Sequence, residues 1–317
     1  MQNVMLSVDN LNVVYETKRL SLSKNVAAKR TISDITFRIK NGETFGLIGE
    51  SGCGKTTTAK AICGLLPCSG SIKLNGNELS SLSRKKRSSE IQMIFQNPYS
   101  SLNPMMRIRQ ILEEPLIIHG YHSSKERLHK AKEMLSIIGL DESYLSRFVR
   151  ELSGGQRQRI AIGCALMLNP KLIVADEILS ALDVSVQANI LNMLTSLNKE
   201  MGVSFLFISH DINVVSYFCD RIAVMFGGEI MEVGNAVDIY NSPAHPYTTA
   251  LIRSVPRMDS VIEPPSIVAN DVPKSHCGCA YAKYCPYLTP MCLTESPMLT
   301  TIGNRQVRCI NLEKGAK

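Results

Sequence analysis

The sequence has no run of apolar residues long enough to cross a lipid bilayer. Its longest apolar stretches, such as residues 160–168, fall well short of the about 18 to 20 residues that a membrane-spanning helix needs. The first ten residues also lack the basic start and the apolar block of a secretory signal. We therefore expect no membrane span, and a protein that stays in the compartment where it is made.

Basic residues only slightly outnumber acidic residues. The 317 residues contain 35 Lys and Arg against 28 Asp and Glu, a net charge of +7, which does not distinguish nucleic acid, anionic lipid and phosphate as ligands. The 44% share of apolar residues excludes a disordered chain, and 20 glycines with 14 prolines exclude a collagen-like one. The length predicts a globular protein of about two domains.

The first fifty residues have the pattern of strands. Residues 4–14 are rich in β-branched and apolar side chains, and a polar, basic loop is expected over residues 17–30. Apolar and polar residues then alternate over 32–39, a turn follows at residues 41–42, and residues 44–48 have the composition of a buried strand.

Further along the chain, strands and helices are predicted to alternate. The apolar runs 172–176 and 203–209, with helix-like residues 184–199 between them, indicate two strands of a parallel sheet and a crossover helix. A capping box at residues 123–126, followed by apolar residues at helical spacing up to Gly139, predicts an amphipathic helix. The pattern is that of an α/β protein.

Residues 49–56, GESGCGKT, match the phosphate-binding pattern G-x-x-x-x-G-K-[ST] between a predicted strand and a helix-like segment. Glycines let backbone N–H groups converge on phosphate oxygens, and the following helix adds its positive end. We expect Lys55 to reach the β- and γ-phosphates and the Thr56 hydroxyl to ligate Mg²⁺. An ordinary glycine turn is the alternative, which the full match disfavours. The residues assigned to nucleotide binding here are Gly49, Ser51, Gly52, Cys53, Gly54, Lys55, Thr56 and Thr57.

A second candidate element is the apolar run LIVAD, which ends in two carboxylates, Asp176 and Glu177. Asp176 at the tip of the strand can hold the Mg²⁺ shell, and Glu177 can accept a proton from the attacking water. A strand running into a solvated acidic loop is the alternative, and a nearby phosphate loop disfavours it.

The segment LSGGQ at residues 152–156 resembles the signature of ATP-binding cassette (ABC) ATPases, and the other motifs of that family follow the expected order. A lone tyrosine or histidine more often serves packing than function, but the joint order over residues 5–235 identifies the chain as a member of the family. The matching residues are Tyr15 for stacking on adenine, Gln96 of the Q-loop, Asp183 of the D-loop and His210 as the switch histidine.

This resemblance implies an α/β fold of the P-loop NTPase class and ABC type, with a helical signature subdomain at about 97–155 and an antiparallel β subdomain. The nucleotide-binding domain is expected over residues 1–240. ATP and Mg²⁺ are the implied cofactors, with Gln96 joining Thr56 and Asp176 around the metal. The implied catalytic residues are Glu177, His210 and Gln96.

In the ABC family, the signature serves the nucleotide that the opposite subunit holds, and two cassettes close head to tail over two ATP molecules. The signature begins a predicted helix, so its backbone N–H groups are donors for a γ-phosphate. We expect the residues at this composite site to be Ser153, Gly154, Gly155, Gln156 and Asp183.

Residues 95–104, 180–188 and 245–248 closely resemble the ATPase subunits of bacterial dipeptide, oligopeptide and nickel importers. The resemblance implies a peripheral protein on the cytoplasmic face of the bacterial inner membrane, with two integral membrane permease subunits and an extracytoplasmic substrate-binding protein. The insert before Thr31 resembles the F-type ATPase, whose companion in a heterodimer is a D-type ATPase. We expect import of di- or oligopeptides, with nickel or a metallophore as the alternative cargo.

Two other classes of ABC protein are less well matched. A non-transport ATPase acting on a ribosome or DNA would show tandem cassettes or a long coiled coil, whereas this sequence has neither heptads nor a second phosphate loop. No nucleic-acid partner is therefore expected. A subunit that binds ATP without hydrolysing it is disfavoured by the intact Lys55, Asp176, Glu177 and His210.

Ten cysteines in a chain without an export signal indicate reduced thiols or metal ligands rather than disulfides. Five of them lie in a C-terminal extension expected over residues 241–317, and four of these five form the candidate ligand set. Four thiolates suit tetrahedral Zn²⁺ or an iron–sulfur cluster, and the spacing of the cysteines does not distinguish between these two groups. The phrase CAYAKYCPYLTPMC resembles the extension of peptide-importer ATPases and favours a [4Fe–4S] cluster, with Zn²⁺ second and free thiols third. The expected ligands are Cys279, Cys285, Cys292 and Cys309, and Cys277 could replace Cys279.

Overall fold

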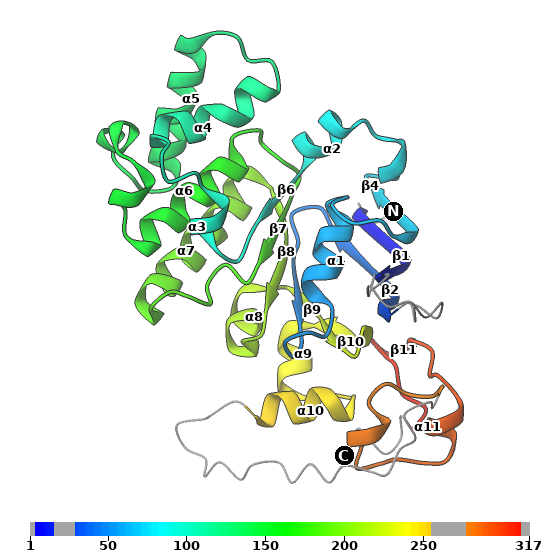
Figure 1. The fold of residues 1–317 in the computed structure, drawn as a ribbon. Helices are drawn as coiled ribbons and strands as arrows, with labels where there is room; N and C mark the ends of the chain where they lie inside the picture. Colours follow the sequence, from blue (N-terminus) through cyan, green and yellow to red (C-terminus); the bar gives the residue numbers. More distant parts are fainter. Residues whose placement is uncertain (1–3, 16–28, 255–276, 312–317) are drawn as a thin grey trace, which may run out of the picture. The chain divides into compact units, whose positions relative to one another are not determined.

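The computed structural model describes residues 4–15, 29–254 and 277–311 (Figure 1). The described chain forms two compact units. Among these residues, the first unit comprises 4–5, 39–44 and 74–208, and the second comprises 6–15, 29–38, 45–73, 209–254 and 277–311. Most of the predicted loop at 17–30 lies outside the described residues.

The first unit contains a parallel run of strands in the order β6–β7–β8. The strands are β6 (Ile91–Ile94), β7 (Leu172–Asp176) and β8 (Ser204–Ser209). Every residue of β7 is buried, which explains its unbroken apolar sequence. Helix α7 (Val184–Met201) crosses from β7 to β8 and buries Ile190, Leu194 and Leu197 at helical spacing. Both predicted strands and their crossover helix are confirmed.

Most helices of the first unit follow β6 in sequence, and Figure 1 shows α4, α5 and α6 gathered together. They are α3 (Pro98–Ser101), α4 (Ile108–Ile118), α5 (Ser124–Ile137), η2 (Glu142–Ser146), η3 (Val149–Glu151) and α6 (Gly154–Leu166), preceded by β5 (Asn77–Glu78), η1 (Leu79–Ser81) and α2 (Arg84–Glu90). The Ser123 side chain accepts a hydrogen bond from the Glu126 N–H, and Gly139 has a left-handed φ of 69°. The predicted start and stop of this helix are confirmed.

A proline inside α4 leaves one backbone carbonyl without its usual N–H donor, and a side chain of another helix replaces that donor. Pro115 has no N–H to give to the carbonyl of Ile111, one turn earlier. The Cys164 thiol of α6 donates to that oxygen across 3.6 Å. Burial raises the pKa of Cys164 to about 12, so the thiol keeps its proton at neutral pH.

Replacing this thiol is expected to weaken the packing of α4 on α6. Because Cys164→Ala removes the donor to a buried carbonyl, we expect it to lower the free energy of unfolding by about 1 kcal/mol. Cys164→Ser keeps a donor and should recover most of the loss. Guanidinium-induced unfolding of the three proteins measures the difference. Equal losses for alanine and serine would assign the effect to lost volume rather than to the hydrogen bond.

The second unit contains a mixed sheet in the order β3–β9–β10–β12–β11. Its strands are β3 (Thr44–Ile48), β9 (Arg221–Phe226), β10 (Glu229–Asn235), β11 (Thr300–Ile302) and β12 (Arg305–Val307). Strands β3 and β9 pair in parallel, and the other neighbours pair antiparallel. In another sheet, β1 (Val4–Tyr15) lies between β2 (Lys29–Lys40) and β4 (Ser69–Leu74). The strands predicted in the first fifty residues are confirmed.

Short helices complete the second unit. They are α1 (Lys55–Ile62), α8 (Ile212–Phe218), α9 (Ala236–Asn241), α10 (Pro246–Arg253), η4 (Ala282–Tyr284) and α11 (Met291–Thr294). Across the described residues of both units, none of the helices combines the length and the apolarity that crossing a bilayer would take.

Residues 277–311 join the second unit through strand pairing and a buried arginine. Strand β12 pairs with β10, with Val307 opposite Glu232. Arg308 is only 3% exposed, and its guanidinium donates to the Ile230 carbonyl at 2.9 Å and to the Asp34 carboxylate at 2.8 Å. These bonds satisfy a charge that is costly to bury alone, and they bind the end of the chain to β10 and β2.

Candidate functional site

The phosphate loop joins β3 to α1 through backbone conformations that favour glycine. A Cβ atom on Gly49 would lie 2.1 Å from the carbonyl oxygen of Met225, and Gly54 has a φ of 112° directly before α1. Ser51 and Gly52 are exposed, while Thr56 and Thr57 are half-buried in the first turn of the helix. The predicted order of strand, glycine loop and helix is confirmed.

The side chain of Lys55 lies within this loop and is 4% exposed. Its ammonium donates to the carbonyl oxygens of Gly49 at 2.8 Å and Glu50 at 2.9 Å. A phosphate oxygen offers the same ammonium a charged acceptor in place of neutral ones. The neighbouring Cys53 thiol is buried, and burial raises its pKa against the opposing effect of Lys55. The Cys53 thiol is therefore an uncharged, buried side chain of the phosphate loop.

In the first unit, the candidate acidic residues lie at the end of β7. Asp176 is the last residue of the strand and is 4% exposed. Glu177 follows with a left-handed φ of 49°, and its N–H donates to the Ile208 carbonyl at 3.0 Å. This turn directs the chain out of the sheet, so the two carboxylates occupy different settings: one buried at the strand tip and one half-buried beyond it.

The structure brings Gln96 and Glu177 together at one edge of a sheet. The Gln96 side-chain amide donates to the Glu177 carboxylate at 3.0 Å. Gln96 lies shortly after β6, and β6 pairs with β7 in parallel with Ile94 opposite Ala175. Because parallel neighbours end at the same edge of a sheet, residues 81 positions apart in sequence meet there.

The signature segment forms the start of α6. Ser153 is the N-cap: its hydroxyl accepts from the Gln156 N–H, and the Gln156 side chain accepts from the Ser153 N–H. This capping box leaves Gly154 and Gly155 in the first turn, where backbone N–H groups favour an anion. A Cβ atom on Gly155 would lie 2.7 Å from the Val186 side chain, so glycine permits the close packing of α6 against α7.

The remaining predicted site residues are Asp183, His210 and Tyr15. Asp183 is the exposed N-cap of α7, and His210 is exposed directly after β8. Tyr15 is the last residue of β1, and its side chain lies outside the described part of the structure. No local sequence pattern marks the contact of Tyr144 with the signature segment, in which the Tyr144 hydroxyl accepts a hydrogen bond from the Gln156 side-chain amide at 2.9 Å.

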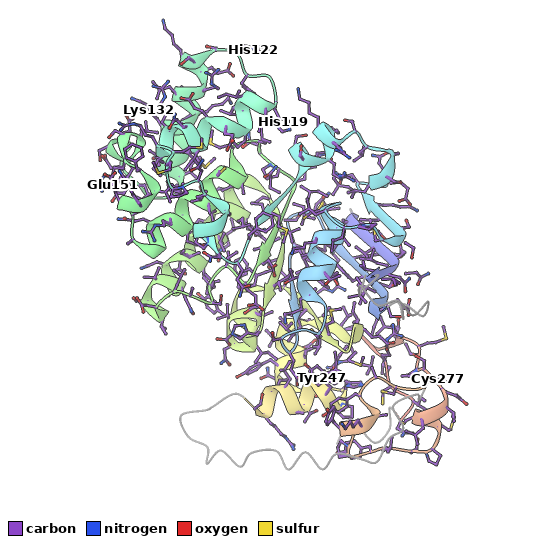
Figure 2. The ribbon with its side chains drawn as sticks, viewed as in Figure 1. His119, His122, Lys132, Glu151, Tyr247 and Cys277 are labelled. Carbon is purple, nitrogen blue, oxygen red and sulfur yellow. The ribbon has the colours of Figure 1, made fainter. Side chains whose placement is uncertain are left out.

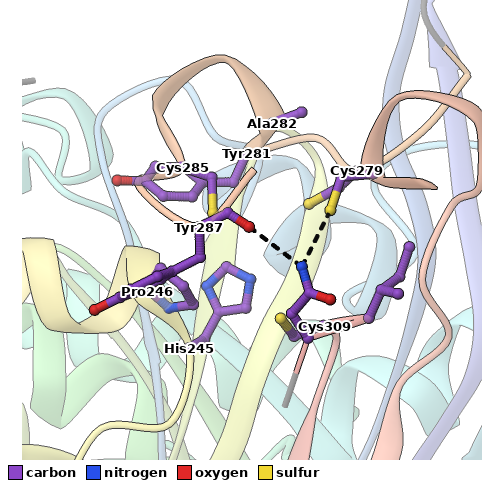
Figure 3. Close-up of a pocket in the computed structure, with 11 residues that line it drawn as sticks. His245, Pro246, Cys279, Tyr281, Ala282, Cys285, Tyr287 and Cys309 are labelled. Atoms are coloured by element: carbon purple, nitrogen blue, oxygen red, sulfur yellow. Dashed lines mark hydrogen bonds between the residues drawn. The ribbon is translucent and has the colours of Figure 1, made fainter. Parts of the chain in front are cut away.

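The four C-terminal cysteines line one pocket. Figure 3 shows Cys279, Cys285 and Cys309 around a common space that also borders His245 and Tyr281. Cys292 is the fourth thiol of the pocket, and Asn311 donates to its sulfur at 3.9 Å. The Cys279 N–H donates to the Cys292 carbonyl at 2.8 Å, which fixes the two chain segments together.

Burial and mutual repulsion both favour the neutral thiols. Burial, reinforced by the other three cysteines, raises the pKa of Cys279 to about 11, and burial also raises the pKa of Cys285 and of Cys309. A cation in the pocket would therefore have to displace protons as it bound. Among the described residues, no group of three or more His, Cys, Asp or Glu side chains is spaced to hold a metal ion, so the geometry gives no evidence for the expected zinc ion or iron–sulfur cluster.

Cys277 has a different setting from the four pocket cysteines. It is exposed, does not line the pocket, and lies at the start of the described part of the extension (Figure 2). Cys279 is buried in the pocket instead, so no substitution of one thiol for the other is needed.

Comparisons with known proteins agree with the motifs. Residues 32–180 match the family model described as "ABC transporter", and residues 231–292 match "Oligopeptide/dipeptide transporter, C-terminal region". The putative oligopeptide transport ATP-binding protein YkfD of Bacillus subtilis is 44% identical over 309 residues, which cover 93% of this chain and 94% of the relative. The di/tripeptide transport ATP-binding protein DppF of Pseudomonas aeruginosa is 40% identical, with 98% of each chain covered.

A solved structure supports the fold independently. The ATP-binding cassette MJ0796, in a dimeric post-hydrolysis state bound to ADP and Pi, superposes with a TM-score of 0.64 at 30% identity. The match covers 73% of this chain and 99% of the cassette. With its phosphate loop, paired Gln96 and Glu177, signature helix and matching C-terminal region, the chain belongs to the ATP-hydrolysing subunits of the oligopeptide/dipeptide ABC transporter family.

Proposed function

We propose that this protein binds and hydrolyses ATP to drive the import of di- or oligopeptides through separate membrane subunits. The observation that carries the proposal is the 3.0 Å hydrogen bond from the Gln96 amide to the Glu177 carboxylate. It joins Gln96, which directly precedes residues 97–110, the segment that we propose contacts the permease, to Glu177, which we propose activates water. We propose that this bond couples the position of residues 97–110 to hydrolysis.

The proposed division of roles follows from the chemistry of each side chain. Thr56, Asp176 and Gln96 provide the oxygen atoms that Mg²⁺ prefers, and the ion would neutralise charge on the β- and γ-phosphates. Glu177 accepts the proton of the attacking water. Lys55 and His210 donate to the charge that develops on the transferred phosphoryl group.

Two cassettes are proposed to close over two nucleotides. Ser153, Gly154 and Gly155 serve the ATP of the partner cassette, with Gln156 and Asp183 beside them, while Tyr15 stacks on the adenine of the chain's own ATP. Support comes from the capping box, which leaves donors of α6 directed away from its own helix. The proposed partner is a related D-type ATPase, and the pair docks on two permease subunits at the cytoplasmic face of the inner membrane.

Reconstitution with these partners tests the proposed function. The chain, its companion ATPase, the two permeases and the substrate-binding protein would be placed in liposomes of bacterial lipid. We expect di- or oligopeptides carried by the binding protein to stimulate ATP hydrolysis and to accumulate inside. Stimulation by nickel or a metallophore and not by peptides would reject peptides as the cargo, an outcome that the names of the relatives disfavour.

We also propose that the cysteine pocket holds a [4Fe–4S] cluster. Four thiols from separate positions line one pocket, and in such a cluster each cysteine binds a different iron atom. No group among the described residues is spaced to hold a single ion, so the proposal rests on the four thiols of the pocket alone. A bound cluster would cross-link the extension.

Loss of one pocket thiol is expected to abolish the cluster. After anaerobic purification, the natural protein should contain about four iron and four sulfide per chain, since that is the composition of the cluster. Cys309→Ser should lose most of the iron and the visible absorption. Cys277→Ser, a change to the exposed cysteine outside the pocket, should lose neither. Iron-free natural protein, or equal loss in both variants, would contradict the assignment.

A further inference from the structure

The backbone of the phosphate loop is held from outside at two points. The Tyr247 hydroxyl of α10 accepts a hydrogen bond from the Glu50 N–H at 3.1 Å. At the other end of the loop, the Gly228 N–H donates to the Cys53 carbonyl at 3.0 Å. Tyr247 is 1% exposed, and Figure 2 places it at the start of α10, nearly 200 residues from the loop it contacts.

The start of α10 is itself fixed by buried polar groups. The His245 ring nitrogen Nδ1 accepts from the Tyr247 N–H at 3.0 Å, which makes His245 the N-cap of the helix. The Glu232 carboxylate of β10 accepts from the His245 N–H at 2.9 Å. The Tyr247 side chain therefore reaches Glu50 from a rigid base rather than from a loop.

The ring of Tyr247 packs in an aromatic cluster that reaches the cysteine pocket. Its centroid lies 4.6 Å from that of Phe226 and 5.4 Å from that of Tyr281, and Phe226 and Tyr281 lie 5.2 Å apart. Tyr281 lines the pocket between Cys279 and Cys285 in sequence and is 5% exposed (Figure 3). One buried ring thus separates the pocket from the tyrosine that holds the phosphate loop.

We propose that Tyr247 is a positioning residue for ATP binding, and that filling the cysteine pocket strengthens its hold on the phosphate loop through Tyr281. The first part needs only the loop to bind phosphate, whereas the second rests on the proposed cluster. A loop fixed before ATP arrives loses less conformational freedom on binding. A filled pocket fixes Cys279 and Cys285, and with them the ring of Tyr281 against Tyr247.

The first experiment removes one oxygen atom. Tyr247→Phe keeps the ring in the cluster but removes the acceptor for the Glu50 N–H, so we expect the Kd and the KM for MgATP to rise about threefold to tenfold. The kcat should change less, because the groups that act on the γ-phosphate are intact. Amide hydrogen exchange in residues 46–54 should accelerate. Tyr240→Phe, which removes a tyrosine hydroxyl bonded to Asn213 elsewhere in the unit, should leave the Kd, the KM, the kcat and the loop exchange unchanged.

The second experiment measures the link to the pocket. Cys285→Ser, which empties the proposed cluster site, should also accelerate exchange in residues 46–54. In the double variant with Tyr247→Phe, the effects should be clearly less than additive, because both act through the same contact. Iron content and the melting temperature of each variant show whether the pocket was emptied and the chain remained folded.

The outcomes separate the two parts of the proposal. Unchanged ATP affinity and unchanged loop exchange in Tyr247→Phe would overturn the positioning role, whether or not iron is present. Additive effects, or a loop unaffected by Cys285→Ser, would overturn the link to the pocket. If the natural protein holds no iron, the link fails together with the cluster, while Tyr247→Phe still decides the role of the hydroxyl.

Discussion

Replacing Glu177 by glutamine is expected to reduce kcat for ATP hydrolysis about 100-fold to 10,000-fold, the range associated with loss of a general base. The amide has nearly the same shape as the carboxylate, and its oxygen can still accept the hydrogen bond from Gln96. ATP binding should therefore persist, and the paired cassettes should stay closed because the nucleotide between them is not consumed. Steady-state hydrolysis and size-exclusion chromatography in MgATP measure the two effects.

A matched change tests whether the position matters rather than the lost charge. Glu200 is an exposed carboxylate at the end of α7, and Glu200→Gln should hydrolyse ATP at the natural rate. Near-normal turnover by Glu177→Gln would remove Glu177 from its role as the base. Loss of ATP binding together with turnover would instead make Glu177 a structural residue at the end of β7.

The second large effect is expected at Lys55. The Lys55→Ala change removes a buried ammonium that donates to two carbonyl oxygens of the phosphate loop. Hydrogen bonds to charged groups contribute about 1.5 to 3 kcal/mol each, so ATP affinity should fall at least tenfold. Hydrolysis should fall further, since the same charge is expected to stabilise the transition state. Binding of a fluorescent ATP analogue and the rate at saturating ATP separate these losses.

Lys60 provides the control in the same helix. It lies in the last turn of α1, away from the loop, and Lys60→Ala should leave ATP affinity unchanged. Because Lys55 also bonds to two backbone carbonyls of the loop, thermal unfolding of both variants shows whether the loop has collapsed. A Lys55→Ala protein that unfolds normally and binds ATP normally would contradict the assignment of the phosphate loop.

Local sequence patterns predicted the individual strands, helices and turns accurately. Strand β7 was expected over residues 172–176 and occupies those residues, because a strand buried on both faces has an unbroken apolar sequence. Helix α5 begins after Ser123 and ends before Gly139, as its cap and its left-handed glycine require. The glycine pattern of residues 49–56 likewise predicts the positive φ angles that Gly49, Gly52 and Gly54 adopt.

Contacts between distant segments were not predictable in the same way. Nothing in the sequence near Tyr247 indicates that its hydroxyl lies on the Glu50 N–H, since the two residues are 197 positions apart. The donor that Cys164 supplies beside Pro115 depends on the packing of α4 against α6. Such contacts arise from the arrangement of elements, which periodicity and capping signals do not encode.

The pairing of β12 with β10 has a consequence for how this polypeptide can be shortened. A fragment ended after α10 would lose both hairpin strands β11 and β12 and the guanidinium that fills the space beside Ile230. It would expose unpaired backbone N–H and C=O groups along β10. An exposed strand edge of this kind favours pairing with a strand of another molecule, and hence aggregation. Strand β12 thus covers the edge of β10, which would otherwise be open to pairing with another copy of the chain.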